Sequence, residues 1–149
     1  MIEFFVPGIC RTAGSKSAFK DKKTGKVHVT HAGKYSKEWM NVVKWFAMKQ
    51  TNRMILLEGP LILKLIFLRD RPKGHFGTSR GEPTKEIKSS SPTFPISKPD
   101  LTKLTRAVED ALTGIVWKDD SQVVRQETAK RYCSPTEKPG VHVSIVEVG

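Results

Sequence analysis

An apolar run of eight residues, Leu61 to Leu68 (LILKLIFL), constrains the fold of this 149-residue chain more than any other segment. It contains a single lysine, and its length is bounded by Pro60 before it and by the charged segment 69–71 with Pro72 after it. A short run rich in leucine, isoleucine and phenylalanine suits a central strand of a sheet better than a helix. We therefore predict a sheet with this segment in its interior.

Two segments space their apolar residues as amphipathic helices do. The first has an apolar face made of Tyr35, Trp39, Val42, Val43, Phe46 and Ala47. We predict Trp39 in the core and Trp45 partly exposed, with a base-stacking role for a tryptophan as the alternative. The second helix has a stripe made of Leu101, Leu104, Val108, Ala111, Leu112 and Ile115. Pro99 suits the entry to this helix, and Gly114 is expected just after its end.

Further strands are predicted at Ile2–Val6, Lys26–Thr30, Val123–Tyr132 and Val141–Val148. Residues 21–25 suit the turn of a hairpin, and the last two strands are expected to pair as a hairpin with a longer loop. The order of strands and helices indicates an α+β fold with two main helices and a small mixed, mostly antiparallel sheet. We expect one domain, residues 1–149.

Residues 71–99 differ in composition from the rest of the chain. They contain five prolines, three glycines and five serines, with six Lys or Arg against two Glu. We predict a long basic loop, because the segment is too polar and too rich in proline for a core element. Its charge would suit a phosphate backbone, although a merely solvated insertion explains it equally well.

The charge balance points to a polyanion as partner. The chain has 26 Lys and Arg against 15 Asp and Glu, a net charge of +11, and a pI near 9.8. It lacks the run of about 18 apolar residues that a membrane-spanning helix needs, so no membrane association is expected. Because its start lacks signal-peptide features, and because Cys10 and Cys133 are too few for a disulfide framework or a zinc site, we expect a cytoplasmic protein. A basic protein without a nucleic-acid partner is the alternative.

Several well-known catalytic motifs are missing from the sequence. The phosphate-binding P-loop, the Rossmann glycine pattern and the zinc motif H-E-x-x-H are absent. One G-x-S-x-G string spans Gly77–Gly81, but its polar, proline-rich flanks are unlike the strand and helix around a serine nucleophile, so we interpret it as chance. The chemistry that remains is that of carboxylates on a basic background.

Acidic residues are concentrated in one short segment. Five of the fifteen lie between positions 100 and 120, namely Asp100, Glu109, Asp110, Asp119 and Asp120. A protein that binds a polyanion has one strong reason to keep carboxylates near its ligand, which is to hold Mg²⁺ or Mn²⁺. Such an ion activates water and neutralises charge on the reacting phosphate. The pattern therefore favours a metal-dependent phosphodiesterase.

The second helix organises this acidic segment. Asp100 lies at its start, Lys103, Arg106 and Asp110 follow on or near its polar side, and Asp119–Asp120 occupy the turn after it. We expect the strand after that turn to run back beside the helix start and to bring Asp120 to Asp100. The alternatives are an ordinary helix-start carboxylate for Asp100, a plain turn for 119–120, and a surface charge or dimer contact for Asp110.

The pattern of restriction nucleases is a competing interpretation of the acidic residues. It would combine Pro99–Asp100 with Glu127 and Lys130, but two residues separate the last pair instead of one. Glu127 and Lys130 would then point to opposite faces of a strand. This pattern is therefore the weaker interpretation.

The run KPDLTKLTRAVEDALTGIVWKDDSQVV, residues 98–124, resembles the signature of the RusA family of Holliday junction resolvases of bacteria and their phages. That signature is approximately K-P-D-x-D-N-L-x-K-A-x-x-D-A-L-N-G, followed by an aromatic residue, one further residue and D-D-x-Q-V. Val6-Pro7-Gly8 and His28-Val29-Thr30 are similar to the family's entry segment. The resemblance covers nearly the whole chain apart from 71–99.

The resemblance implies a symmetric homodimer that requires Mg²⁺, or Mn²⁺ as a substitute, and that makes paired nicks in a four-way junction or other branched DNA. By position, Asp100 and Asp120 correspond to catalytic acids, with Asp119 beside the latter as a further metal ligand. Arg106 stands where the family has lysine, Lys103 is a further candidate catalytic cation, and Asp110 matches a recurrent acid. The candidate DNA-binding residues are Arg11, Lys16, Lys20, Lys22, Lys23, Arg71, Lys73 and Arg80.

One position departs from the family pattern. Thr102 stands where a second acid is common, and threonine cannot supply a carboxylate charge. Under the resemblance, Asp100, Asp119 and Asp120 would hold the metal together with water. A non-catalytic protein of a phage or prophage that binds branched DNA with the same fold is the alternative function.

Overall fold

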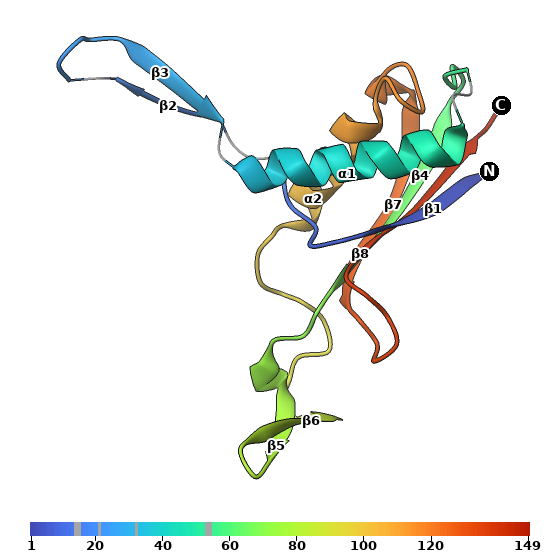
Figure 1. Cartoon of the computed structure of the whole chain (residues 1–149). Helices are drawn as coiled ribbons and strands as arrows, with labels where there is room; N and C mark the ends of the chain where they lie inside the picture. Colours follow the sequence, from blue (N-terminus) through green and yellow to red (C-terminus); the bar gives the residue numbers. More distant parts are fainter. Residues whose placement is uncertain (14–15, 21, 32, 53–54) are drawn as a thin grey trace.

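A four-stranded sheet forms the centre of the molecule (Figure 1). The computed structural model describes residues 1–13, 16–20, 22–31, 33–52 and 55–149. The strands lie in the order β1 (Ile2–Pro7), β8 (Gly140–Glu147), β4 (Leu61–Arg69) and β7 (Val123–Tyr132). The β1–β8 and β8–β4 pairs are antiparallel, whereas β4 and β7 are parallel. The α+β class with a mixed, mostly antiparallel sheet is thus confirmed, and the predicted central strand is central.

The pairing of the last two strands differs from the prediction. A hairpin of β7 with β8 was expected, but β4 lies between them and pairs with both. The inward side chains of β4 are fully buried, so this strand is stabilised by neighbours on both of its edges. The connection between β7 and β8 passes the end of β4, where the Cys133 amide donates to the Arg69 carbonyl at 2.8 Å.

Two helices cover one face of the sheet (Figure 1). They are α1 (Lys34–Thr51) and α2 (Leu101–Leu112), with Gly114 at φ +84° just past the end of α2, as predicted. The core between these helices and the sheet is apolar. Its fully buried side chains include Val6, Val43, Ala47, Leu61, Leu63, Leu65, Phe67, Leu104, Val108, Leu112 and Trp117.

The tryptophan predictions for α1 are confirmed, since Trp39 is 4% exposed and Trp45 is 56% exposed. The apolar face of α1 is narrower than predicted. Tyr35 is 65% exposed, because the first turn of α1 extends past the edge of the sheet (Figure 1), and Val42, in the middle of α1, is 38% exposed. Among the described residues, no helix is both long enough and apolar enough to cross a membrane.

Two hairpins project from the body of the molecule (Figure 1). The first, β2 (Lys16–Lys20) with β3 (Val27–His31), confirms the hairpin expected around residues 21–25, of which Asp21 lies outside the described residues. The second, β5 (Phe76–Ser79) with β6 (Glu82–Ile87), lies within 71–99 and corrects the prediction of a long loop. A short 3₁₀ turn, η1 (Lys73–His75), precedes it.

A two-residue turn explains the second hairpin. Arg80 and Gly81 both have positive φ, +54° and +79°, which is the backbone of the tight turns that join twisted antiparallel strands. The base of this hairpin is held by Arg71, whose Nη1 donates to the Pro92 carbonyl at 2.7 Å and whose guanidinium lies 4.3 Å from the centre of the Tyr132 ring. Arg71 therefore connects the hairpin to the sheet.

Candidate active site on helix α2

Helix α2 is buried on one side and carries charges along the other. Its buried residues are Leu104, Thr105, Ala107, Val108, Ala111 and Leu112. Its exposed side presents Lys103 and Arg106 in the middle, Asp100 at the N-terminal end and Asp110 near the C-terminal end. The apolar spacing in the sequence creates this division, because a stripe that packs on the core leaves the opposite positions in solvent. The polar face is thus acidic at both ends and basic between them.

At the N-terminal end, the Asp100 carboxylate is available for a ligand. Asp100 is the N-cap residue of α2, yet its side chain accepts no capping hydrogen bond from the helix backbone. One of its oxygens lies 3.3 Å from the Lys103 Nζ, and both side chains are more than half exposed. A depression of about 320 Å³ runs beside this pair, lined by Thr12, Ala13, Lys98, Pro99, Asp100, Lys103 and Arg106. An acid and three exposed cations, Lys98, Lys103 and Arg106, therefore face one hollow.

Two cations hold the chain that leads into this end of the helix. Lys130, on β7, donates from Nζ to the carbonyls of Ser97 and Pro99 at 2.9 and 3.1 Å. Arg69, at the end of β4, donates from Nη1 to the Lys98 carbonyl at 2.8 Å. Charge-assisted hydrogen bonds to three successive carbonyls fix the position from which Asp100 projects.

Lys130 is the functional candidate that the sequence interpretation missed. In the sequence, Lys130 is indicated only by the restriction-nuclease pattern, in which it is paired with Glu127. The two residues do lie on opposite faces of β7: Lys130 faces the start of α2, while Glu127 pairs with Arg125 at 2.8 Å and with Lys64 at 4.0 Å. This confirms the geometric objection to the restriction-nuclease pattern.

At the other end, Asp119 and Asp120 begin a short 3₁₀ turn, η2 (Asp120–Gln122). Asp119 Oδ1 accepts from the Ser121 amide at 2.8 Å. Hydrogen bonds from the side chain and the backbone amide of Ser121 lower the pKa of Asp119, so its carboxylate is ionised at neutral pH. Gln122 fixes the turn: its amide oxygen accepts from the Lys118 and Asp119 amides, and its amide nitrogen donates to the carbonyls of Leu57 and Gly59.

Further acids gather near this turn. Burial raises the pKa of Glu109, the hydrogen bond from Gln126 lowers it, and the negative charges of Asp120 and Asp110 raise it further. The net shift is upward. Burial first, and then the neighbouring negative charges, therefore disfavour the ionised form of Glu109 at the C-terminal end, whereas the acid at the N-terminal end is paired with a lysine.

The structure does not bring Asp120 to Asp100 within one chain. Strand β7 runs back along α2 as predicted, but its far end carries Lys130 to the helix start, while Asp120 precedes the strand. The twelve residues of α2 put roughly 18 Å between its two ends. Among the described residues, no group of three or more His, Cys, Asp or Glu is arranged to hold a metal ion. The expected cluster of Asp100 with Asp120 in one chain is therefore wrong, because Asp120 precedes β7 and lies at the opposite end of α2 from Asp100.

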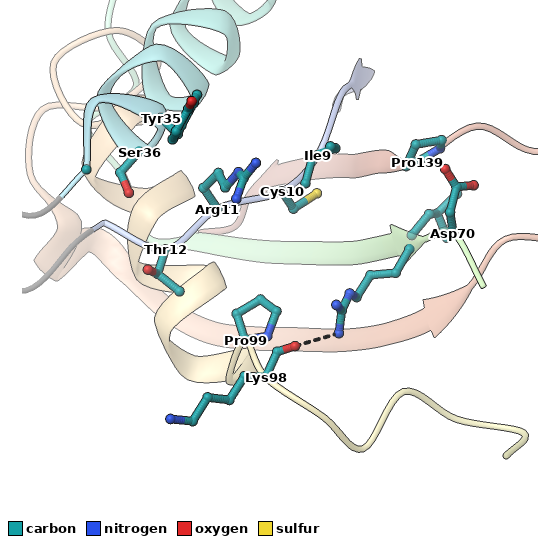
Figure 2. A pocket seen from close by; sticks show the side chains of 13 residues that line it. Ile9, Cys10, Arg11, Thr12, Tyr35, Ser36, Asp70, Lys98, Pro99 and Pro139 are labelled. Atoms are coloured by element: carbon teal, nitrogen blue, oxygen red, sulfur yellow. Dashed lines mark hydrogen bonds between the residues drawn. The ribbon is translucent and has the colours of Figure 1, made fainter. Parts of the chain in front are cut away.

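The predicted DNA-binding residues fall in three regions. Arg11 lies close to the start of α2, in a pocket shown in Figure 2. Lys22 and Lys23 are in the exposed turn of the β2–β3 hairpin, while the side chains of Lys16 and Lys20 lie outside the described part. Lys73 and Arg80 are exposed on the segment of the second hairpin, and Arg71 is engaged in its base. The basic side chains thus surround the N-terminal end of α2 and extend along two projections.

Together, the fold and the helix define a small α+β protein with acids and exposed cations on one helix of a basic surface, a composition suited to acting on a nucleic acid. The chain matches the family model described as Endodeoxyribonuclease RusA over residues 12–146. It therefore belongs to the RusA family, which indicates endodeoxyribonuclease activity of the Holliday junction resolvase type on branched DNA. It is also 32% identical over 128 residues, 85% of this chain and 83% of the relative, to the uncharacterized protein YqaN of Bacillus subtilis (strain 168).

Proposed function

We propose that this protein resolves four-way DNA junctions by paired symmetric nicks, in a reaction that requires Mg²⁺ and two copies of the chain, as a step of DNA recombination and repair. Family membership supports the substrate, and one observation carries the mechanism. The candidate catalytic acids lie at opposite ends of a helix whose middle is basic.

The carboxylates of Asp100, Asp119 and Asp120 are hard oxygen donors of the kind that Mg²⁺ and Mn²⁺ prefer. Within one chain, Asp100 lies too far from Asp119 and Asp120 to share an ion with them. Bound there, the metal would activate water and neutralise charge on the phosphate. The donor chemistry therefore fits the metal, provided that the two ends of α2 meet across two chains.

A twofold axis across the middle of α2 would meet that condition. In a symmetric dimer with antiparallel α2 helices, the N-terminal end of each helix faces the C-terminal end of its partner. The order of charges on the exposed face of α2 is acid, base, base, acid, which is symmetric about the middle of the helix. The rotation therefore places acids opposite acids, where a metal ion would lie between them, and bases opposite bases, where phosphates would bind. Each of the two sites would then combine Asp100 of one chain with acids at positions 119 and 120 of the other.

Thr102 also favours a shared site. It is exposed in the first turn of α2, where the family commonly has a second acid. With a threonine there, the N-terminal end contributes the single carboxylate of Asp100, so the remaining negative charge must come from residues 119 and 120. We propose that Lys103 and Arg106 bind the phosphate and balance its charge, that Lys130 positions Asp100, and that Asp110 supports the site as a further acid.

Incubation of the protein with a labelled synthetic four-way junction tests this function. We expect symmetric nicks in Mg²⁺ or Mn²⁺ and none in EDTA. Asp100→Asn and Asp120→Asn should each abolish nicking and leave the band shift of the bound junction. The control is Glu86→Gln, an acid on the β5–β6 hairpin, which should nick as the wild type does. Nicking retained in both aspartate variants would exclude the assigned site.

The second candidate function is that of a non-catalytic protein that binds branched DNA. Thr102 is the observation that favours it, because the family's second acid is missing. A shifted junction band without any cut product, in Mg²⁺ and in Mn²⁺, would support the binding protein over the nuclease.

A further inference from the structure

A second pocket adjoins the hollow beside Asp100 (Figure 2). It has a volume of about 630 Å³ and lies between the segment after β1, the first turn of α1, the end of β4 and the turn before α2. The pocket and the hollow share Thr12, Lys98 and Pro99 in their walls, so they form one continuous depression. A strand of DNA whose phosphate lies at Asp100 would therefore have this pocket beside its neighbouring nucleotide.

The walls of the pocket have the chemistry of a nucleotide site. Arg11 stands 5.3 Å from the centre of the Tyr35 ring, and the two side chains lie together at one side of the pocket (Figure 2). Tyr35 is 65% exposed, although its spacing in the sequence suited a core residue. An exposed tyrosine ring and a guanidinium plane are the surfaces on which proteins stack unpaired bases.

The cations in the pocket suit the phosphates on either side of such a base. In the described part of the chain, no carboxylate pairs with Arg11 or with the Lys98 ammonium, so both are available to a phosphate. Tyr35 and Ser36 belong to the first turn of α1, an 18-residue helix with no acidic residue in that turn. The positive end of the helix dipole there adds to the attraction for an anion.

One carboxylate in the wall gives the pocket a means of selection. Asp70 lies near Pro139, away from Tyr35 (Figure 2), and close enough to Cys133 to act on its thiol. Burial and the nearby carboxylates of Asp70 and Glu137 raise the pKa of Cys133 to about 11, so the thiol stays protonated and does not compete as an anion. The carboxylate keeps further lone pairs with which to accept from a ligand. Thymine has no exocyclic amine, and its one ring donor, N3–H, lies between two carbonyl oxygens that a carboxylate repels, so an acceptor-only group favours bases with an exocyclic amine.

We propose that this pocket binds the unstacked bases of the nucleotides next to the scissile phosphate, with one base stacked on Tyr35 or Arg11 at one side and the exocyclic amine of the adjacent base donating to Asp70 at the other. The inference rests on the proposed nuclease function and deepens it, since it assigns the sequence preference of cutting to named residues. An unpaired base is accessible at the branch point of a junction and not within an intact duplex, so the same pocket contributes to selection of branched DNA.

The test uses a set of four-way junctions that carry each of the four bases at the two positions flanking the cut. Initial nicking rates are measured in Mg²⁺, and dissociation constants are measured in Ca²⁺ for the same junctions. For the wild type, we expect cutting to be about tenfold slower with thymine than with an amine-bearing base at one of these positions. Asp70→Asn should remove this difference, because an amide both donates and accepts.

Two further variants separate recognition from stability. Tyr35→Ala should weaken cutting of all four junctions, and Tyr35→Phe should restore it, because stacking needs the ring and not the hydroxyl. Cys133→Ala is the matched control for Asp70: it removes the thiol contact, keeps the carboxylate and should keep the wild-type preference.

Equal rates on all junctions for the wild type, or an unchanged preference in Asp70→Asn, would overturn the pocket proposal while leaving the nuclease function intact. If no junction is cut at all, the proposed function fails, and the affinities in Ca²⁺ then decide on the pocket alone. A thymine penalty in binding that Asp70→Asn removes supports the pocket, and equal affinities exclude it.

Discussion

The two ends of helix α2 differ in charge and in how they are held. At the N-terminal end, one acid, Asp100, is paired with Lys103, and the chain before it is fixed by Lys130 and Arg69 through hydrogen bonds to carbonyls. At the C-terminal end, the acids of residues 109, 110, 119 and 120 collect around a turn that is held by the uncharged Gln122 amide and by the buried Trp117. One end is suited to bind a phosphate, and the other is suited to bind a cation.

This difference explains why neither end forms a complete site. A lone carboxylate next to a lysine has too little negative charge to hold a divalent ion, and a turn in which acids outnumber cations repels DNA. A nuclease that needs both must bring one of each together. Two chains related by a twofold axis provide two such combinations, which matches two symmetric cuts in a four-way junction.

The largest expected effect concerns the anchor of the acidic end. The Trp117 indole is fully buried, and its Nε1 donates to Thr113 Oγ1 at 3.0 Å. Trp117→Ala should lower the free energy of unfolding by about 3–5 kcal/mol, because it leaves a large cavity and removes the hydrogen bond from the indole to Thr113. Urea denaturation measures this loss. Trp45→Ala, at an exposed position on α1, should cost less than about 1 kcal/mol, and equal losses would contradict the assigned packing.

The two proposed catalytic acids should affect the rate of nicking and not the stability of the fold. Asp100→Asn and Asp120→Asn are each expected to slow junction nicking by at least about 10²- to 10³-fold, since removal of a metal ligand costs several kcal/mol in the transition state. Gel-resolved nicking rates and a thermal melt measure the two quantities. A variant that melts early and nicks slowly would show that the acid maintains the fold.

Lys130 should have an intermediate effect, confined to the basic end. Lys130→Met removes the two hydrogen bonds to the carbonyls of Ser97 and Pro99, so Asp100 loses its fixed position. We expect nicking to fall about tenfold while junction affinity changes less, and Lys130→Arg should recover part of the rate. Lys85→Met, on the second hairpin, serves as the control for loss of one positive charge. An equal fall in that control would mean that charge alone matters.

The smallest effect tests, through pH, the burial of Glu109 among the acids of the acidic end. The pKa of Glu109 is raised in the folded state, so folding favours its protonated form. Stability linked to this group is present below its unfolded pKa and is lost as pH rises through the folded value. Glu109→Gln should therefore raise stability at pH 7 by less than about 1 kcal/mol and leave it unchanged at pH 3. Thermal melts at the two pH values measure this, and a loss of stability at pH 7 would contradict it.

The sequence predicted the elements better than their partners. The apolar run of Leu61 to Leu68 predicts a buried strand, because a central strand covers a run of this length on both faces of a sheet. The apolar stripe of α2 identifies the side of the helix that is buried. Alternation in the last two strands indicates their faces and not their neighbours, so the insertion of β4 between them could not be foreseen. The hairpin at 76–87 was missed because Arg80–Gly81 is a less familiar turn than Asn–Gly, and because Pro83 argues against a strand.

The residue types of the candidate site could also be predicted, but their arrangement could not. The motif identified Asp100, Lys103, Arg106 and the acids at 119 and 120, and the acids also stand out in composition on a basic background. Lys130 was not predicted in its role because it acts on backbone carbonyls of Ser97 and Pro99, which leave no pattern in the sequence. The separation of the two ends follows from the length and direction of α2, which only the fold supplies.

The central claim, that each site combines the two ends of α2 from different chains, can be tested by mixing two inactive variants. Asp100→Asn and Asp120→Asn are co-expressed with different affinity tags, and dimers that contain one chain of each are purified through both tags. A shared site predicts that such a dimer has one intact site, with Asp100 and Asp120 both present, and one site with neither. It should therefore make single nicks in a four-way junction in Mg²⁺, whereas each variant alone makes none. A mixed dimer as inactive as its parents would show that each site lies within one chain and would contradict the account.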